Sequence, residues 1–157
     1  MPSDLESNLT LKMLREFAPQ AVDEVREFRG EITIYLRSDL LIRACEFLRD
    51  EPSLSYTFLS DVTAVDLYPN EPRFEVVYHL LSLKNAERLR LKVRAGGGNP
   101  SVDSLVPVYP SANAFEREVF DLFGIQFAGH PYLQRILMPE DWEGYPLRKD
   151  YPTEGYR

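Results

Sequence analysis

Four prolines interrupt the C-terminal part of the chain so often that no long helix or strand can form there. They are Pro131, Pro139, Pro146 and Pro152, and each one restricts its backbone and lacks the N–H that a helix or an inner strand needs. The apolar residues between them follow neither a helical nor a strand period. The sequence therefore predicts a folded domain in residues 1–124 and an extended irregular tail in residues 125–157.

The composition of this tail nevertheless differs from that of disordered segments, which are poor in aromatic and aliphatic residues. A long irregular segment that is rich in such residues is ordered by packing against a surface. The domain offers only part of that surface, so we expect a partner protein to cover the rest. The residues concerned are Phe127, Tyr132, Ile136, Leu137, Trp142, Tyr145, Leu147, Tyr151 and Tyr156.

Periodicity in the domain predicts three helices and five strands. Arg88 to Arg94 alternates most clearly, because Leu89, Leu91 and Val93 stand between charged residues. The order of the elements and the short turns favour an α+β fold, with a mainly antiparallel sheet and helices packed on one face. The expected helices are Leu11–Ala18, one capped by Ser38 or Asp39 and ending near Arg49, and one capped by Ser111 or Asn113 and ending at Gly124. The expected strands are Val25–Phe28, Glu31–Leu36, Phe58–Tyr68, Phe74–Leu83 and Arg88–Arg94.

The sequence offers few residues for cofactor chemistry. The 157 residues include one cysteine, whereas an iron–sulfur cluster or a structural zinc ion takes about four Cys or His ligands. Cys45, His79 and His130 are scattered singly, and no nucleotide-binding glycine motif opens a helix. We therefore expect no catalytic residue, no metal and no cofactor in this chain, and we interpret Cys45 as a buried inert thiol and His79 as a structural residue.

The formal net charge of −7 argues against general nucleic-acid binding, which usually requires a basic surplus. No apolar run approaches the roughly 20 residues that span a bilayer. The first residues do not resemble a signal peptide, because no basic stretch precedes an apolar one. With a single cysteine and no internal disulfide, a cytoplasmic location is the simplest expectation.

The last predicted strand carries four basic residues on one face, Arg88, Arg90, Lys92 and Arg94. Like charges on neighbouring positions of a sheet destabilise it unless acids neutralise them. The favoured interpretation is a solvated face that is paired with the domain's own acids. The alternatives are a docking face for an acidic partner and, more weakly, RNA binding, since no exposed aromatic residues interleave with the stripe.

The third predicted helix has an aromatic face and a charged face. Phe115, Val119 and Leu122 are spaced as one apolar side of a helix. The opposite side is expected to be solvated. Arg117 and Asp121 are spaced so that they can pair, whereas the like charges of Glu118 and Asp121 favour a cation from outside the helix. Two further phenylalanines, Phe120 and Phe123, widen the apolar side, and the charged residues are Glu116, Arg117, Glu118 and Asp121.

The residues from this helix onward form an unusual string. It runs FEREVFDLFGI from Phe115, GHP from Gly129, RILMP from Arg135 and DWEGYPLRKDYP from Asp141. This string closely resembles the C subunit, also called the 30 kDa subunit, of bacterial NADH:quinone oxidoreductase, which is respiratory complex I. The sharp match covers about residues 115–152, and the preceding domain resembles the family more loosely, in length and order of elements.

The resemblance implies a non-catalytic scaffold in the peripheral arm of the complex, on the cytoplasmic face of the bacterial membrane. In that family the chain packs against the D subunit, which helps to form the quinone site, and lies near the B and I subunits. FMN and the iron–sulfur clusters belong to partner subunits, and the whole complex passes electrons from NADH to quinone while it pumps protons. The chain would then be associated with the membrane only through the complex, and it would bind no nucleic acid.

The resemblance also implies a set of interface residues toward other subunits. Charged residues of the helix would contact neighbouring segments or subunits, charged residues of the tail would anchor it, and aromatic residues would be its apolar anchors. His130 is expected to be a structural hydrogen-bonding residue. The full set is Glu116, Arg117, Glu118, Asp121, His130, Arg135, Trp142, Tyr145, Arg148, Lys149, Asp150 and Tyr151.

Two alternatives stay open at the level of the sequence. The same scaffold could serve a related complex that uses ferredoxin, a deazaflavin or hydrogen, because the electron donor binds other subunits. A free-standing RNA-binding or protein-binding module is the weaker alternative, motivated by the basic stripe from Arg88 to Arg94.

Overall fold

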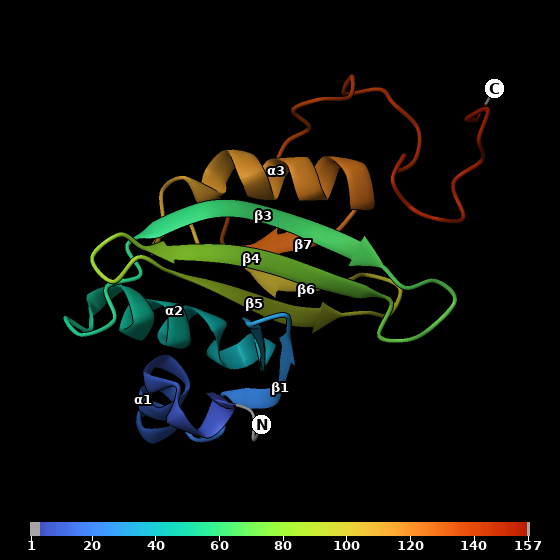
Figure 1. Cartoon of the computed structure of the whole chain (residues 1–157). Coiled ribbons are helices and arrows are strands. Elements are labelled where there is room, and N and C mark those ends of the chain that lie inside the picture. Colours follow the sequence, from blue (N-terminus) through green and yellow to red (C-terminus); the bar gives the residue numbers. More distant parts are fainter. Residues whose placement is uncertain (1–3, 157) are drawn as a thin grey trace.

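The computed structural model describes residues 4–156, so the predictions on residues 1–3 and on Arg157 lie outside the described part. A five-stranded sheet in the order β1-β2-β5-β4-β3 forms the centre of the domain (Figure 1). The helices are η1 (Asp4–Ser7), α1 (Leu9–Phe17), η2 (Ser38–Leu40), α2 (Leu41–Asp50) and α3 (Ala112–Phe123). The strands are β1 (Val22–Phe28), β2 (Glu31–Leu36), β3 (Phe58–Asp66), β4 (Phe74–Ser82), β5 (Glu87–Ala95), β6 (Ser101–Asp103) and β7 (Gln126–Ala128).

Alternation along the central strands separates an apolar face of the sheet from a polar one. On β5, Leu89, Leu91 and Val93 are buried in the core, while the basic residues between them lie on the other face. The buried apolar residues of α1, α2 and α3 belong to the same core cluster, so all three helices pack on the apolar face. The predicted α+β fold with a mainly antiparallel sheet is therefore confirmed, and only the β2–β5 pairing within this sheet is parallel.

The predicted side-chain N-cap bonds are absent, although Ser111 is the N-cap residue of α3 and Gly124 ends this helix as predicted. Neither η2 nor α2 has a side-chain cap bond, and the carboxylate of Asp39 instead pairs with Arg37 at 2.8 Å. At α3, the N-cap residue Ser111 donates its hydroxyl to the carbonyl oxygen of Leu59 at 3.3 Å. Asp39 thus bonds a residue two positions away, whereas Ser111 bonds a residue of β3, a contact that the local sequence does not reveal. The buried position predicted for Cys45 is confirmed, and burial raises the pKa of its thiol to about 12.

A two-stranded parallel sheet of β6 and β7 was not predicted, and its buried residues Val102 and Phe127 join the core of the domain. Its strand β7 directly follows α3, so regular structure continues to Ala128 before the irregular segment begins. From Gly129 to Tyr156 the chain forms no helix or strand. Figure 1 shows this segment leaving the end of the domain near α3 as an extended loop.

Candidate protein–protein interface

Helix α3 carries four of the charged residues predicted to form contacts, and the structure divides them into two groups. Glu116 and Asp121 have no exposed surface, whereas Arg117 is half-buried and Glu118 is exposed. The prediction of a solvated charged face is therefore wrong for Glu116 and Asp121. Other parts of the chain cover these two carboxylates with hydrogen-bond donors, which replace the lost hydration.

Asp121 binds the beginning of the tail. Its Oδ1 accepts a hydrogen bond from the Arg135 guanidinium at 2.9 Å. Its Oδ2 accepts three more, from the consecutive backbone N–H groups of residues 136–138 at 3.2, 2.8 and 2.9 Å. Burial alone would raise the pKa of Asp121, but these bonds outweigh burial and hold the pKa below its usual value. The external cation that the sequence required is thus supplied by the tail.

Arg117 also holds the tail, through backbone oxygens. It does not pair with Asp121; its guanidinium donates to the carbonyl oxygens of Gln134 and Arg135 at 3.0 and 3.2 Å. On the neighbouring turn of the tail, His130 Nε2 lies 3.0 Å from the carbonyl oxygen of Asn113, and His130 Nδ1 accepts from a backbone N–H at 2.9 Å. The first half of the tail therefore follows α3 and is bonded to it along its length.

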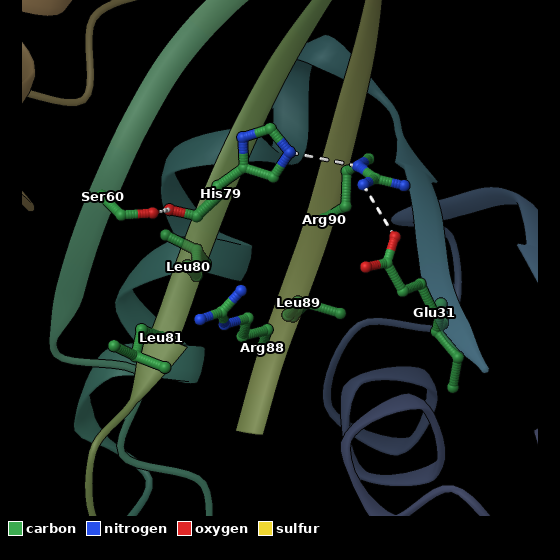
Figure 2. A pocket seen from close by; sticks show the side chains of 9 residues that line it. Glu31, Ser60, His79, Leu80, Leu81, Arg88, Leu89 and Arg90 are labelled. Carbon is green, nitrogen blue, oxygen red and sulfur yellow. Dashed lines mark hydrogen bonds and ion pairs between the residues drawn. The ribbon is translucent and has the colours of Figure 1, made fainter. Parts of the chain in front are cut away.

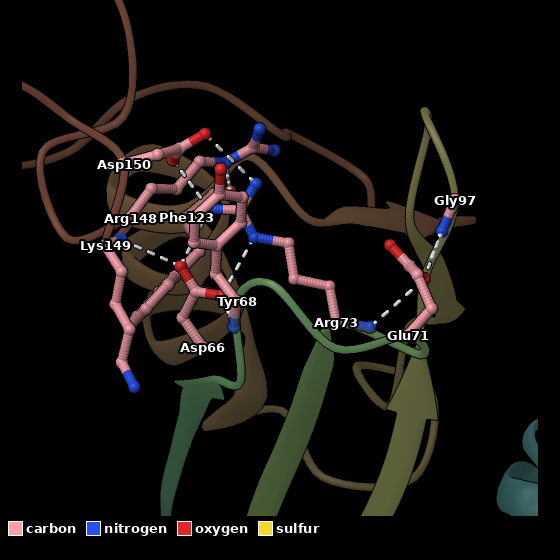
Figure 3. A network of polar contacts seen from close by, with 9 residues as sticks. All are labelled: Asp66, Tyr68, Glu71, Arg73, Gly97, Phe123, Arg148, Lys149 and Asp150. Carbon is pink, nitrogen blue, oxygen red and sulfur yellow. Dashed lines mark hydrogen bonds and ion pairs between the residues drawn. The ribbon is translucent and has the colours of Figure 1, made fainter.

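A second buried carboxylate, Asp66 at the end of β3, holds the last part of the tail (Figure 3). Arg73 donates to both of its oxygens at 2.8 Å, and the backbone N–H of Lys149 donates to Oδ2 at 2.8 Å. Arg73 also pairs with Asp150 at 2.6 Å, so one guanidinium joins the domain to the tail. Burial opposes ionisation of Asp66, yet the bonds from Arg73, Lys149 and Tyr68 lower its pKa to about 2.

Arg148 fixes the tail to the end of α3. Its Nε donates to the carbonyl oxygen of Phe123 at 2.6 Å, and its guanidinium lies over the rings of Phe74 and Tyr145 at 5.3 and 4.9 Å. Gly124 makes this approach possible, because a Cβ there would stand 2.6 Å from Tyr145 and 2.7 Å from Arg148. Gly124 also has a φ of +77°, which favours glycine.

The predicted anchors of the tail differ in how they act. Arg135, Arg148 and Asp150 use their side chains, whereas Lys149 contributes its backbone N–H to Asp66. Tyr145 stacks under Arg148, and Tyr151 packs edge-on against Tyr156 at 5.4 Å. Trp142 retains 40% of its surface exposed.

Sequence reasoning missed Asp66 and Arg73, which bind the tail from the domain. They lie seven positions apart around the turn between β3 and β4. Lys149, which bonds Asp66, lies 83 positions after Asp66 in the chain. No local pattern connects residues at such separations. The one available signal was Asp66 itself, an acid at the end of an apolar strand.

The tail is anchored through its polar groups and leaves apolar side chains in solvent. Leu137 is 61% exposed and Leu147 is 53% exposed, although both belong to well-bonded turns. Further aromatic and aliphatic residues on this segment are exposed in the same way: Tyr132, Ile136, Trp142 and Tyr156. Apolar side chains that are held in place but uncovered are typical of a surface that a protein partner completes.

Glu116 ties α3 to the loop that follows β6. Its carboxylate accepts a hydrogen bond from the hydroxyl of Ser104 at 2.9 Å and another from the backbone N–H of Leu105 at 2.7 Å. No cation among residues 4–156 pairs with it. Burial therefore dominates and raises the pKa of Glu116 to about 7, although the two hydrogen bonds act in the opposite direction.

Among the described side chains of residues 5–156, no three His, Cys, Asp or Glu residues gather into a potential metal site. In the same part of the chain, no helix combines the length and the apolar character needed to cross a membrane.

Comparison with known proteins relates the chain to one family. A family model described as "Respiratory-chain NADH dehydrogenase, 30 Kd subunit" matches residues 34–157. The C subunit of NADH-quinone oxidoreductase from Roseiflexus sp. (strain RS-1) is 51% identical over 148 residues, which cover 94% of this chain and 85% of the relative. The C subunit from Geobacter sulfurreducens is 48% identical over 151 residues, covering 96% and 92%.

Two solved structures share the fold. A trypsin-resistant fragment of Nqo5 is 29% identical, with a TM-score of 0.64, and covers 78% of this chain and 97% of the fragment. A chain of the membrane-bound sulfane sulfur reductase, an archaeal respiratory membrane complex, is 27% identical, with a TM-score of 0.74, and covers 94% and 86%.

Proposed function

The chain belongs to the family of the 30 kDa subunit of respiratory-chain NADH dehydrogenase, and from this we propose that it is a cofactor-free scaffold of the peripheral arm of a proton-pumping NADH:quinone oxidoreductase. In this proposal FMN and the iron–sulfur clusters lie in partner subunits, which pass electrons from NADH to quinone. The chain works at the cytoplasmic face of the bacterial membrane, to which it is attached through the complex.

The observation that carries the scaffold role is the construction of the tail. Two buried carboxylates, Asp121 and Asp66, fix its backbone to the domain, while Leu137, Trp142 and Leu147 stay exposed. A partner that covers these side chains gains apolar contact without the entropy cost of ordering the tail, because the domain has already ordered it. We assign the D subunit of the complex to this surface, with the B and I subunits nearby.

Purification of the tagged full chain from its native membranes tests this function. We expect the chain to bring with it the cluster-bearing and quinone-binding subunits, and we expect the preparation to reduce quinone with NADH. Recovery of the chain only as an isolated monomer would contradict the proposal.

A second candidate is the same scaffold role in a complex with another electron donor. The similarity to a chain of the sulfane sulfur reductase complex favours it, but the NADH-quinone relatives have much higher identity to this chain. Assaying the purified complex with NADH and with reduced ferredoxin distinguishes the two, and activity with ferredoxin alone would select the second.

A further inference from the structure

The polar face of the sheet, which the helices leave free, borders a cavity of about 420 Å³. It lies where β4 ends and where β5 and β2 begin (Figure 2). His79 and Leu81 of β4, Arg88 and Arg90 of β5, and Glu31 of β2 contribute to its lining. This surface is distinct from the tail and α3, and nothing in the proposed function uses it.

Three of the four basic residues of β5 are neutralised within the domain. Arg90 pairs with Glu31 at 3.0 Å and Lys92 with Glu75 at 3.4 Å. Arg94 pairs with Glu24 of β1. The favoured interpretation of the basic stripe, pairing with the domain's own acids, is therefore correct at these three positions.

Arg88 is the exception. Among the side chains of residues 5–156 no acid lies within ion-pair distance of its guanidinium, and the side chain is exposed. The acid beside it in the sequence, Glu87, accepts a hydrogen bond from the hydroxyl of Tyr56 at 3.2 Å and does not pair with Arg88. All five N–H donors of Arg88 therefore remain available to a ligand in the cavity.

The other polar groups of the cavity are already engaged. Nε2 of His79 accepts a hydrogen bond from Arg90 at 3.1 Å, and Nδ1 of His79 lies 3.6 Å from a carboxylate oxygen of Asp61. Figure 2 shows the imidazole of His79 and the guanidinium of Arg90 pointing toward one another. Arg90 spends its charge on Glu31 and donates to His79 and Thr33, so Arg88 is the cation of this cavity whose charge is left unpaired among the described side chains.

An apolar row extends from Arg88 across the sheet. Leu81 lies opposite Arg88 in the β4–β5 pairing, and Phe58 lies opposite Leu81 in the β3–β4 pairing. Residues opposite one another in antiparallel strands project to the same face, so the three side chains form a line. Phe58 is 49% exposed and Leu81 is half-buried.

We propose that this cavity binds a carboxylate side chain, next to an apolar residue, in an acidic segment of another protein of the assembly. One free guanidinium matches one carboxylate, which it can bind through two parallel hydrogen bonds. A polyanion such as RNA fits poorly, because Glu31 and Asp61 flank the site and the chain has a net charge of −7. The apolar row favours a polypeptide over a small free anion. The proposal rests on the proposed function only in requiring that the chain works in an assembly.

Photocrosslinking in the assembled complex tests the site. The photoreactive residue p-benzoylphenylalanine replaces Phe58, so that Arg88 stays intact, and the crosslinked peptides are identified by mass spectrometry. We expect a crosslink to an Asp- or Glu-containing segment of another protein of the complex. Arg88→Glu in the same background should lower its yield about tenfold, and the milder Arg88→Gln about threefold, as for the loss of a charge pair at an interface. Arg15→Glu, the same charge change on exposed α1, should leave the yield unchanged.

A crosslink to nucleic acid, to the chain's own tail or to no other protein would overturn the proposal, as would a yield that does not change in Arg88→Glu. The same photoreactive residue at Leu137 of the tail separates this failure from failure of the proposed function. If Leu137 crosslinks to a partner and Phe58 does not, only the cavity proposal is lost.

Discussion

Three buried carboxylates show how surroundings set the titration of one kind of chemical group. Asp66 and Asp121 each accept hydrogen bonds from an arginine and from backbone N–H groups, so their pKa values are lowered. Glu116 accepts only from Ser104 and from a backbone N–H, and burial raises its pKa. The two aspartates therefore stabilise the fold when ionised, whereas Glu116 stabilises it when protonated.

Replacing Glu116 with glutamine should raise the unfolding free energy at neutral to alkaline pH, because glutamine cannot ionise in the buried site. The folded pKa of about 7 lies above the usual value of 4.5, so the stabilisation is complete below pH 4.5 and is lost as pH rises through 7. This amounts to about 3 kcal/mol between those limits. In urea unfolding, Glu116→Gln should resemble the native chain at pH 5 and be the more stable at pH 8. Equal pH slopes for both proteins would contradict this, and Glu118→Gln at an exposed position is the control.

Asp66 should show the opposite dependence. Its folded pKa of about 2 lies below the usual value of 3.8, so its contribution is present above pH 3.8 and is lost as pH falls toward 2. The native chain should lose about 2 kcal/mol of unfolding free energy over this range through Asp66 alone. Asp66→Asn should be less stable at pH 6 and have a shallower acid limb. A parallel acid limb in the variant would show that Asp66 does not titrate as the structure indicates.

Asp121→Asn should destabilise the chain at neutral pH by about 2–4 kcal/mol. Both oxygens of Asp121 face donors, Arg135 on one side and the N–H groups of residues 136–138 on the other. An asparagine must therefore direct its NH₂ group at one set of donors. The shift of the urea midpoint measures the effect, and a change below about 0.5 kcal/mol, as at ordinary surface sites, would contradict the role of Asp121 as an anchor.

At the scale of elements, the junction between α3 and the tail depends on one glycine. Gly124→Ala places a Cβ within 2.6–2.7 Å of Tyr145 and Arg148 and imposes a φ of +77° on a residue that avoids it. We expect destabilisation by about 2 kcal/mol or more, together with faster proteolysis of the tail. Gly98→Ala is the matched control, because a Cβ there meets nothing within 4 Å. Equal behaviour of the two variants would show that the tail does not dock against Gly124.

Local periodicity was sufficient to predict the main elements. The strand Glu31–Leu36 has its predicted bounds, and the alternation of Leu89, Leu91 and Val93 correctly identified the core face of β5. The parallel pairing of β2 with β5 was not predictable, because pairing partners far apart in sequence leave no local pattern. Strands β6 and β7 span three residues each, which is too short for a period to show.

The candidate interface was less accessible to sequence reasoning than the fold. The aromatic tail was recognisable from its composition. The sequence also indicated that Asp121 needs a cation from outside its helix, but it did not identify Arg135 as that cation. The burial of Glu116 was missed, because a carboxylate at a helix position next to other charges is usually exposed. Asp66 and Arg73 were missed because their connection to the tail exists only in three dimensions.

At the scale of the molecule, two different sets of residues hold the tail in place and remain exposed on it. Buried polar groups fix the path of the tail, and exposed apolar side chains remain on it, where the proposed function requires a partner to cover them. A substitution at the exposed positions should therefore affect assembly and leave the fold intact, whereas a substitution at the buried carboxylates should affect both. If the tail is an interface, substitutions at its exposed positions affect assembly; if it only stabilises the domain, they do not.

The double variant Leu137→Ala with Trp142→Ala should make that separation visible. These side chains are 61% and 40% exposed, so the unfolding free energy of the isolated chain should change by less than about 1 kcal/mol. Apolar anchors at the centre of an interface each contribute about 1–2 kcal/mol or more to binding, so the fraction of chain in the complex on a native gel should fall at least about tenfold. Phe28→Ala, 69% exposed on β1, is the control for loss of an exposed apolar residue elsewhere. If the double variant assembles as well as the control, the exposed residues of the tail do not bind the partner, and its function would be confined to covering α3.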